Sequence, residues 1–499
     1  MSSTLTLLHE LRAHAGPRTT QGLDDATVAR FDDLDPKLGL AVREAVVLQR
    51  SLRAEGSPLV ALPEDEACAA AQEGFVNFYA PDAVNPYVAL AARGPWLVTL
   101  HGAVVHDSGG YGMLGFGHHP DDVADTLARP WVVANVMTPS PSHRRFVDAL
   151  RAELGHTRAG GCPFDRFLCV NSGSEAVTVG MRIADRRAKR LTDPGGPHEG
   201  ARVRVLAMEG GFHGRTDRPA HASASTRPSY LAHLRSFRDD PDPLVTVPMN
   251  DVEALRAAFA QAEADGTYLE LVMLEPVMGE GRPGVAVSRA FYDEARRLTR
   301  AHGSLLLVDS IQAGLRAHGV LSIVDYPGFA DAEPPDLETW SKAINAAQYP
   351  LSVLGMSAEA AAEYVTGIYG NTMTANPRGL EVGIAVLDRL TPALRAHIVQ
   401  AGTWLREALE ALQAELPELV TGVTGTGLLV AAHLDPEKAP VLGEHGVERA
   451  CRVRGLGVIH GGRNAIRLTP HFAIGREEIA LVVQELGAVL RERLPVGAA

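Results

Sequence analysis

Short apolar runs alternate with longer amphipathic stretches through the middle of the chain. The runs are continuously hydrophobic, which is typical of strands buried on both faces of a mostly parallel sheet. They are FLCV (167–170), VRVLAM (203–208), LELVMLEP (269–276), SLLLVDS (304–310) and SVLGM (352–356). The stretches between them have helical spacing of apolar residues, so the pattern predicts an α/β fold.

The two ends of the chain have different patterns. Near the start, LGLAVREAVVLQRSL (38–52) has helical spacing and predicts a helix that packs on a neighbour. Near the end, long Ala/Leu-rich stretches surround two apolar runs and predict a smaller α+β domain. We therefore expect an N-terminal helical extension (1–60), the N-terminal part of a small domain (61–110), a large domain (111–385) and the C-terminal part of the small domain (386–499).

Composition excludes several classes of protein. The net charge of -13 argues against nucleic-acid binding, which usually requires a basic surface. No apolar run reaches the roughly 18 residues of a membrane span, and the first residues do not resemble a secretion signal. The four cysteines have no CxxC spacing, so we expect neither a zinc site nor a disulfide framework. The sequence predicts a cytoplasmic protein without a metal.

Unusual polar segments follow the apolar runs. They are NSGSE, EGGFHGRT, EPVMGEG and DSIQAG. Ligands of open α/β sheets bind at the carboxyl ends of the strands, so we expect these segments to meet at one site.

The first of these segments has the pattern of an anion site. Ser172 and Glu175 have capping-box spacing, and the amides of the first helical turn attract phosphate. Gly173 lets the backbone approach a phosphate closely, and Ser174 offers a hydroxyl. Taken alone, the same residues are better explained by a plain helix cap.

An aspartate and a lysine suggest cofactor chemistry. Asp309 ends an apolar strand, where a carboxylate is costly without a partner. It could face a pyridinium nitrogen or cap a helix. Lys342 is one of four lysines and follows a semi-apolar segment, where its amine could form a Schiff base. A solvated surface lysine is the alternative.

The order of six motifs resembles the class III aminotransferase family. They are NSGSEA (171–176), GFHGRT (211–216), EPVMGEG (275–281), VDSIQAG (308–314), SKA (341–343) and NTMTANP (371–377). The resemblance covers roughly residues 85–495. It implies the fold-type I architecture of pyridoxal 5'-phosphate (PLP) enzymes, with a large, mostly parallel sheet flanked by helices and a smaller α+β domain.

The resemblance implies a role for each matching residue. Gly173 and Ser174 would hold the cofactor phosphate. Phe212 would stack on one face of the pyridine ring, and Ile311 would pack on the other.

The remaining cofactor residues follow from the same resemblance. Asp309 would pair with the ring nitrogen, and Gln312 would lie near the ring hydroxyl. Lys342 would form the Schiff base and then move the α-proton. Thr372 would reach the phosphate of the partner subunit, which implies an obligate homodimer with shared active sites.

Substrate recognition is implied at the C-terminal end. Arg467 matches the family arginine that binds a substrate carboxylate, a task that suits the forked guanidinium. Glu280 matches the glutamate that pairs with this arginine in some members. Arg463 is a second candidate for the carboxylate. An ion pair at a subunit interface would also explain Arg467 and Glu280.

The chain departs from the family near the cofactor. Ser310 replaces a glutamate, Ala313 replaces a threonine, and an arginine appears one place early as Arg316. Asn345 and Gln348 stand where small residues are usual. These departures leave PLP binding intact and bear on the substrate and the reaction type.

We therefore expect a transaminase that moves an amino group from an amino acid or terminal amine to a keto acid by a ping-pong cycle. The segment TPSPSHRRF (138–146) is similar to the lysine ε-aminotransferase branch, which favours a terminal amine and 2-oxoglutarate. A racemase, epimerase or decarboxylase of the same family is the alternative. A third possibility is a non-catalytic binding protein, against which the presence of both Lys342 and Asp309 argues.

Overall fold

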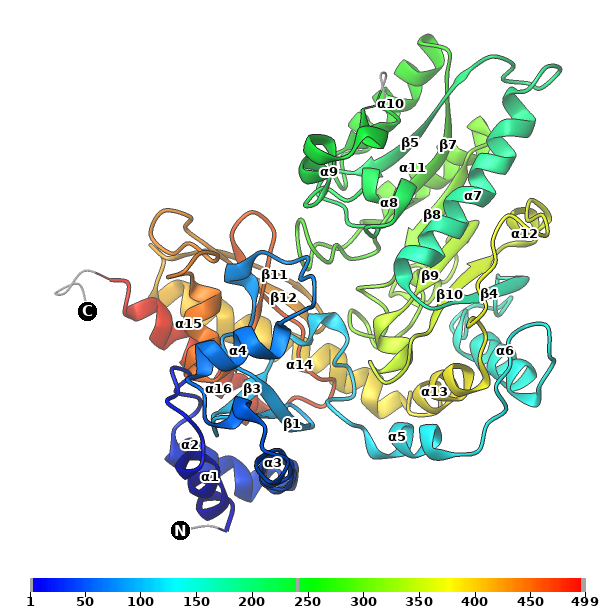
Figure 1. Ribbon diagram of the computed structural model, residues 1–499. Helices are drawn as coiled ribbons and strands as arrows, with labels where there is room; N and C mark the ends of the chain where they lie inside the picture. The colour runs from blue at the N-terminus through cyan, green and yellow to red at the C-terminus, as the bar shows by residue number, and fades with distance from the viewer. Residues whose placement is uncertain (1–2, 239–241, 495–499) are drawn as a thin grey trace. The chain divides into compact units, whose positions relative to one another are not determined.

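The computed structural model describes residues 3–238 and 242–494. Contacts within the chain define two units (Figure 1). The large unit is Asp122–Val399, and the small unit combines Met1–Asp121 with Gln400–Ala499. The four-part division expected from the sequence stays a prediction. Among the described residues, no helix is long and apolar enough to cross a bilayer.

A mixed sheet forms the centre of the large unit. Its described residues form seven strands, in the spatial order β4 (Arg166–Val170), β10 (Ser352–Met356), β9 (Leu337–Trp340), β8 (Leu305–Asp309), β7 (Thr267–Leu274), β5 (Arg202–Met208) and β6 (Leu244–Val247). The strands from β9 to β6 are parallel, and β10 is antiparallel to both of its neighbours. All five predicted runs form strands, which confirms the mostly parallel α/β fold.

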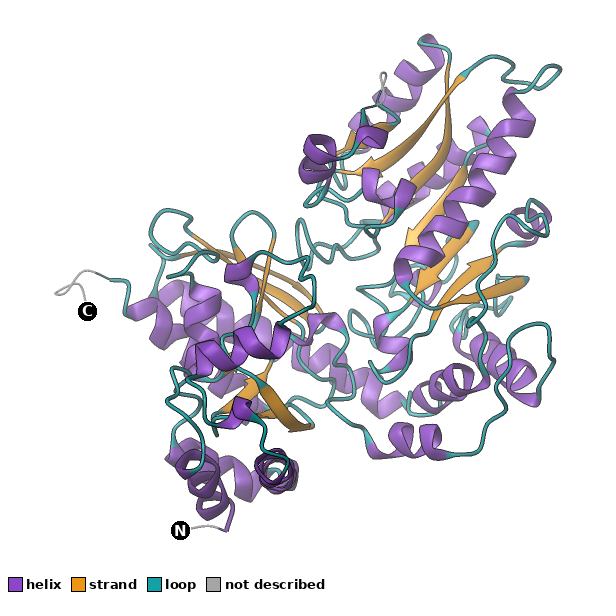
Figure 2. Ribbon diagram, viewed as in Figure 1, coloured by secondary structure: helices purple, strands orange, loops and turns teal. Residues whose placement is uncertain are grey.

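Helices flank this sheet (Figure 2). The helices with residues in the large unit are α5 (Asp121–Ala128), α6 (Pro141–Glu153), α7 (Gly173–Thr192), α8 (Asp217–His221), α9 (Arg227–His233), α10 (Val252–Ala264), α11 (Arg289–His302), α12 (Ala358–Ala362), α13 (Pro377–Leu387) and α14 (Pro392–Glu415), the last of which continues into the small unit. Short 3-10 helices are η4 (Arg235–Phe237), η5 (Ile323–Asp325) and η6 (Lys342–Asn345).

Helix α7 shows how the sequence builds this unit. Ser172 is its N-cap, and Glu175 completes the predicted capping box, which fixes where the helix begins. Gly180 lies on its buried face, where an added Cβ atom would come within 2.6 Å of the Leu307 side chain on β8. The absence of a side chain at this glycine therefore lets α7 lie close against the sheet. This packing holds the first turn of α7 at the carboxyl ends of the strands.

The small unit contains two sheets. In its described residues, one sheet has the order β1 (Ala89–Arg93), β2 (Trp96–Thr99), β3 (Val104–Asp107) and β13 (Leu456–Gly457), and the other has the order β11 (Val420–Thr426), β12 (Leu429–Leu434), β15 (Ala465–Leu468) and β14 (Ile459–Gly461). The helices are α1 (Ser3–Ala13), α2 (Asp25–Leu34), α3 (Pro36–Ala54), α4 (Glu64–Gln72), α15 (Val447–Arg454) and α16 (Arg476–Arg491), with 3-10 helices η1 (Pro58–Val60), η2 (Pro81–Ala83) and η3 (Gly110–Gly112).

The N-terminal helices share a hydrophobic core with the first of these sheets. Trp96 on β2 is fully buried, packs 5.1 Å from the ring of Phe31 and donates to Asp35 at 2.8 Å. Helix α3 contains the helix predicted at 38–52, and its buried face contributes Val42 and Ala45 to the same core. The first helices are thus packed against the small unit's own sheet.

Candidate active site

Two predicted catalytic residues lie at the ends of neighbouring strands. Strands β8 and β9 are parallel, and Asp309 at the end of β8 is in register with Thr339 on β9. Lys342 follows β9 after one residue and begins η6. Its backbone has φ 51, a left-handed conformation that is uncommon for a residue with a side chain. The tight turn after β9 thus keeps Lys342 at the same edge of the sheet as Asp309.

The carboxylate of Asp309 is held by two neighbouring side chains. Nδ1 of His213 lies 2.9 Å from Oδ2, and the Thr339 hydroxyl donates to Oδ1 at 3.2 Å. Burial lowers the pKa of His213, but the hydrogen bond and charge of Asp309 outweigh it, so the pKa is raised. His213 therefore presents an N–H to a carboxylate that is only 3% exposed. This arrangement can hold a proton on a basic ring nitrogen.

A second buried carboxylate orders the loop that carries Phe212. Glu275 accepts the backbone N–H of Phe212 at 3.1 Å and that of Gly279 at 2.8 Å. Burial raises the pKa of Glu275 to about 7, and the nearby charge of Asp309 acts in the same direction. The ring of Phe212 is half-buried, and the Arg215 guanidinium lies 5.2 Å from its centroid. Glu275 thus fixes the backbone from which Phe212 projects.

The predicted anion site lies at the first turn of α7. Ser174 is in this turn, and its hydroxyl accepts the backbone N–H of Arg215 at 3.3 Å. Gly214 has φ 114, and an added Cβ atom would come within 2.4 Å of the Ser174 hydroxyl. Only glycine therefore permits this approach of the GFHGRT loop to the helix start. Free amides at a helix N-terminus attract a phosphate.

Two more predicted residues close around this turn. An added Cβ atom on Gly173 would come within 2.6 Å of Ile311, and one on Gly279 within 2.3 Å of Gln312. Gln312 is buried, and its Oε1 atom has no hydrogen-bond partner among residues 3–238 and 242–494. A buried polar atom without a partner is costly, which suggests that a ligand group completes the site.

These residues fit PLP. The first turn of α7 suits its phosphate, Asp309 suits its ring nitrogen, and the unpartnered amide oxygen of Gln312 suits its ring hydroxyl. Lys342 is suited to supply the amine that this cofactor requires. The structure thus brings together the motifs NSGSEA, GFHGRT, EPVMGEG and VDSIQAG, three of which carry predicted cofactor residues, and places Lys342 at the same strand edge. The individual roles stay predictions.

The segment that contains Thr372 contacts the start of helix α7 in its own chain. Tyr369 and Asn371 both donate to Oε1 of Glu175 at 2.9 Å, and the Thr372 carbonyl accepts from Asn135 at 2.9 Å. Separation along the chain therefore does not keep this segment away from its own cofactor site. The assignment of Thr372 to a partner's phosphate stays a prediction.

The predicted substrate residues belong to different units. Arg467 lies on β15 of the small unit and is 5% exposed, whereas Arg463 is exposed. Glu280 belongs to the large unit, where its carboxylate accepts a hydrogen bond from Ser225. The expected pairing of Glu280 with Arg467 stays a prediction.

The structure explains the departure at Ser310. Glu338 on β9 is fully buried and accepts the Ser310 hydroxyl at 2.5 Å, the Ser322 hydroxyl at 2.5 Å and the Ile323 N–H at 3.0 Å. Burial raises the pKa of Glu338 to about 7. A carboxylate from the neighbouring strand thus lies beside the serine that replaces the family's glutamate.

The polar residues after Lys342 close a tight loop. Asn345 donates to the carbonyl of Leu351 at 2.8 Å and accepts the N–H of Ala347 at 2.8 Å. Ala346 and Ala347 both have positive φ. The side chain of Asn345 therefore stabilises a backbone turn for which glycine is the usual residue.

Sequence reasoning assigned no role to four buried residues of the site: His213, Glu275, Thr339 and Glu338. His213 lies inside the quoted GFHGRT motif, and Glu275 begins EPVMGEG. A buried histidine beside a predicted catalytic aspartate was a signal that could have been used. The strand positions of Thr339 and Glu338 carry no comparable local signal.

Comparisons with known proteins agree with this geometry. The class-III aminotransferase family matches residues 78–490. The chain is 30% identical to an acetylornithine aminotransferase of Mesorhizobium japonicum (78% of this chain, 89% of that protein) and 28% identical to one of Rhodobacter capsulatus (81% and 94%). Its fold is similar to that of the ornithine aminotransferase of Toxoplasma gondii, with a TM-score of 0.72, 22% identity, and coverage of 88% of this chain and 98% of that chain. The chain therefore belongs to the class-III aminotransferase family of PLP-dependent enzymes.

Proposed function

We propose that this protein transfers the terminal amino group of a diamino acid or its acylated derivative to a keto acid such as 2-oxoglutarate. The observation that supports catalysis is the buried carboxylate of Asp309, which His213 and Thr339 hold by hydrogen bonds. Asp309 ends β8, and the neighbouring strand β9 leads to Lys342. The family supplies the reaction class. The identities of the amino donor and the keto acid are what we propose.

The chain's own residues divide the work of the reaction. When bound, PLP supplies an electron sink for the negative charge that develops on the reacting carbon. Asp309 keeps a proton on the ring nitrogen, because a carboxylate stabilises the cationic ring. The Nζ atom of Lys342 takes a proton from the carbon that bears the amino group and returns it to a neighbouring atom. Glu275 keeps Phe212 in place beside the ring.

Relatives support a terminal amine as the donor. Two are named acetylornithine aminotransferase, and another, from Photorhabdus laumondii, is named acetylornithine/succinyldiaminopimelate aminotransferase. The TPSPSHRRF segment adds no support. Ser140 and Pro141 begin helix α6, and the Ser140 hydroxyl lies 2.9 Å from His143 as part of a helix cap. The role of Ser140 and His143 in capping helix α6 therefore explains this segment without a contact to the substrate.

A single-turnover experiment tests the reaction. The PLP-loaded protein is mixed with N-acetylornithine, ornithine or lysine in the absence of a keto acid. A transaminase releases at most one carbonyl product per site and resumes only when 2-oxoglutarate is added. Continuous release of CO2, or inversion of the donor without a carbonyl product, would instead show the alternative reaction type. Reaction at the α-amine alone would overturn the proposed donor class.

A matched pair of lysine variants assigns the catalytic amine. Lys342→Ala should abolish product release and the covalent cofactor label that borohydride fixes on the protein. Lys189→Ala is the control, because this exposed lysine forms a surface ion pair with Asp193, at 2.6 Å, at the end of α7. Loss of the label in the control variant alone would refute the role of Lys342.

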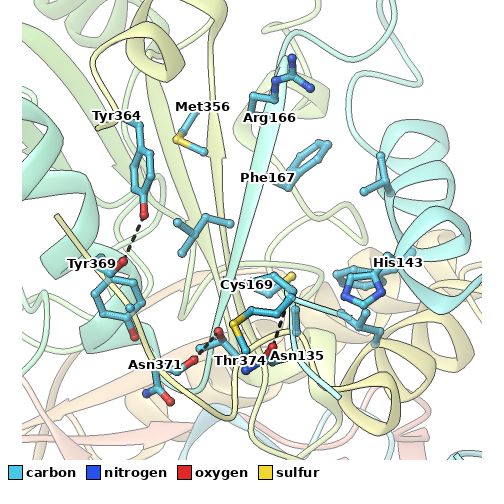
Figure 3. Close-up of a pocket in the computed structure, with 18 of the residues that line it drawn as sticks. Asn135, His143, Arg166, Phe167, Cys169, Met356, Tyr364, Tyr369, Asn371 and Thr374 are labelled. Atoms are coloured by element: carbon cyan, nitrogen blue, oxygen red, sulfur yellow. Dashed lines mark hydrogen bonds between the residues drawn. The ribbon is translucent and has the colours of Figure 1, made fainter. Parts of the chain in front are cut away.

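We further propose a homodimer in which a second copy covers the face beside β4. This strand is at the edge of its sheet, and a cavity of about 760 Å³ lies next to it (Figure 3). Of the residues that line this cavity, Met137 (83%) and Val136 (65%) are exposed, as are Val133 (88%) and Met373 (51%) in the same two chain segments. Apolar surface of this extent favours a protein partner. Thr372 is adjacent to Met373, which supports its proposed contact with a partner's site.

Sedimentation and mixed dimers test this arrangement. Met137→Asp should shift the protein toward monomers, and a fully active wild-type monomer would refute the proposal. A dimer with Thr372→Ala on one chain and Lys342→Ala on the other retains one intact site only if Thr372 serves its partner. If Thr372 serves its own chain, both sites of this mixed dimer are impaired.

We also propose that the protein works in the cytoplasm. All four cysteines are free thiols: Cys68, Cys162, Cys169 and Cys451. Free thiols are common in reducing compartments, which supports this location. Cell fractionation with an antibody against the native protein tests it, and recovery outside the cytoplasmic fraction would refute it.

A further inference from the structure

Two histidines and a glutamate meet inside the small unit. His106 is the next-to-last residue of β3, His471 lies in the loop after β15, and Glu478 is in the first turn of α16. The Nε2 atoms of His106 and His471 lie 3.2 Å and 2.8 Å from the same oxygen, Oε1 of Glu478. One ligand atom from each residue lies within 4.8 Å of the other two. Three separate segments thus direct polar atoms at one point.

Hydrogen bonds outside the cluster orient its members. Nδ1 of His106 lies 2.9 Å from the Ser108 hydroxyl, which leaves Nε2 facing the cluster. Oε2 of Glu478 accepts the Gly475 N–H at 2.8 Å, so Oε1 is the oxygen that remains for the cluster. Partners of this kind typically orient the imidazole and carboxylate ligands of metal sites.

Burial and charge also suit a cation. The side chain of His106 is fully buried, whereas those of His471 and Glu478 are 11% and 16% exposed. Glu478 offers a carboxylate oxygen, a negatively charged ligand that zinc accepts. The cluster is closed on the side of His106 and partly open on the side of His471.

We propose that His106, His471 and Glu478 bind a divalent zinc ion that fastens the start of α16 to β3. Two imidazole nitrogens and one carboxylate oxygen are a ligand set that zinc accepts, with water in the fourth position on the open side. Tetrahedral zinc at its usual bond lengths places ligand atoms about 3.4 Å apart. The hydrogen-bonded spacings of 3.2 Å and 2.8 Å are shorter than this value by about 0.2 Å and 0.6 Å, so side-chain movements of less than an ångström are sufficient.

Metal titration tests the site independently of catalysis. The PLP-loaded protein is stripped with a chelator and titrated with Zn²⁺ by calorimetry and with Co²⁺ by visible absorption. We expect one ion per chain, the absorption bands of a tetrahedral cobalt site, and a higher melting temperature with zinc. A wild-type protein that binds no stoichiometric metal has a hydrogen-bonded cluster only, and the proposal then fails.

Conservative variants separate a metal site from a hydrogen-bonded cluster. Gln at position 471 or 478 can keep a hydrogen bond but is a poor zinc ligand, so H471Q and E478Q should each weaken zinc binding by more than about tenfold. His460→Ala is the control, because His460 pairs with another buried glutamate, Glu448, at 3.1 Å in the same unit. Unchanged zinc affinity in both glutamine variants, or its loss in the control, would overturn the assignment.

Discussion

Nδ1 of His213 lies 2.9 Å from Oδ2 of Asp309, and both side chains are buried. The two residues come from different strand ends, so the fold itself creates the pair. Because a carboxylate that faces a ring nitrogen must keep one orientation, His213 is a positioning residue for Asp309 in the proposed reaction.

We expect His213→Leu to lower kcat by about 10- to 100-fold, since a hydrogen bond to a charged group contributes about 1.5–3 kcal/mol. His213→Asn should recover part of this loss, because an amide N–H can replace Nδ1. The KM for the donor should change less than kcat. Steady-state kinetics on both variants provides the check, and a wild-type kcat in His213→Leu would exclude the positioning role.

Asp309→Asn should keep the melting temperature near that of the wild type and lose most of the activity. A neutral amide cannot hold the ring nitrogen protonated, so the electron sink is lost. Thr339→Val, which removes one donor to the same carboxylate, should cause a smaller loss. Thermal melts and turnover measured side by side decide the point. Near-full turnover in Asp309→Asn would show that a protonated ring is not required.

Glu338→Gln should change how stability depends on pH. Burial raises the pKa of Glu338 from its ordinary value of 4.5 to about 7, so the unfolded chain releases this proton more readily than the folded one. This carboxyl therefore costs the folded wild type up to about 3 kcal/mol as pH rises from 4.5 to 7. Glutamine does not titrate, so the stability of the variant relative to the wild type should increase across this range.

Denaturant unfolding at pH 5, 6, 7 and 8 measures this difference. Glu270 and Glu275 also have raised pKa values, but they are present in both proteins and cancel in the comparison. A stability difference that stays constant from pH 5 to pH 8 would show that Glu338 titrates normally.

Arg467→Ala should raise the KM for the keto acid strongly, because a bidentate guanidinium–carboxylate pair is worth about 1.5–3 kcal/mol. Glu280→Ala should leave the acceptor half-reaction nearly intact and slow the half-reaction with a terminal-amine donor. Half-reaction kinetics on the two variants separates these effects. Unchanged binding of 2-oxoglutarate in Arg467→Ala would move the carboxylate site elsewhere, with Arg316 the next residue to vary.

The positions of most strands of the large unit's sheet could be predicted from the sequence, because continuous apolar runs indicate buried strands. The segment 352–356 was predicted and forms β10, yet its antiparallel direction was not, since local hydrophobicity does not record strand direction. Strand β6 was missed because Leu244–Val247 is short and only partly buried. The order of the motifs predicted which segments form the candidate site.

The remaining part of the candidate site depends on contacts between segments. Thr339 and Glu338 are adjacent in sequence, but one supports Asp309 and the other supports Ser310, because alternate strand residues point to opposite faces. The cluster around Glu478 has the same origin. His106 and His471 are far apart in the chain and share no metal-binding spacing, so the sequence led to the expectation of no zinc site.

The hydrogen bonds of Glu175 limit which positions can be mutated when new variants of this enzyme are made. One of its carboxylate oxygens accepts the backbone N–H groups of Asn171 and Ser172, and the other accepts Tyr369 and Asn371. Shortening this side chain by one methylene would release at least one of the two segments that it joins. A mutant library aimed at new amine donors should therefore keep Glu175 fixed and vary positions such as Ser225 and Glu280, whose side chains hydrogen-bond to each other.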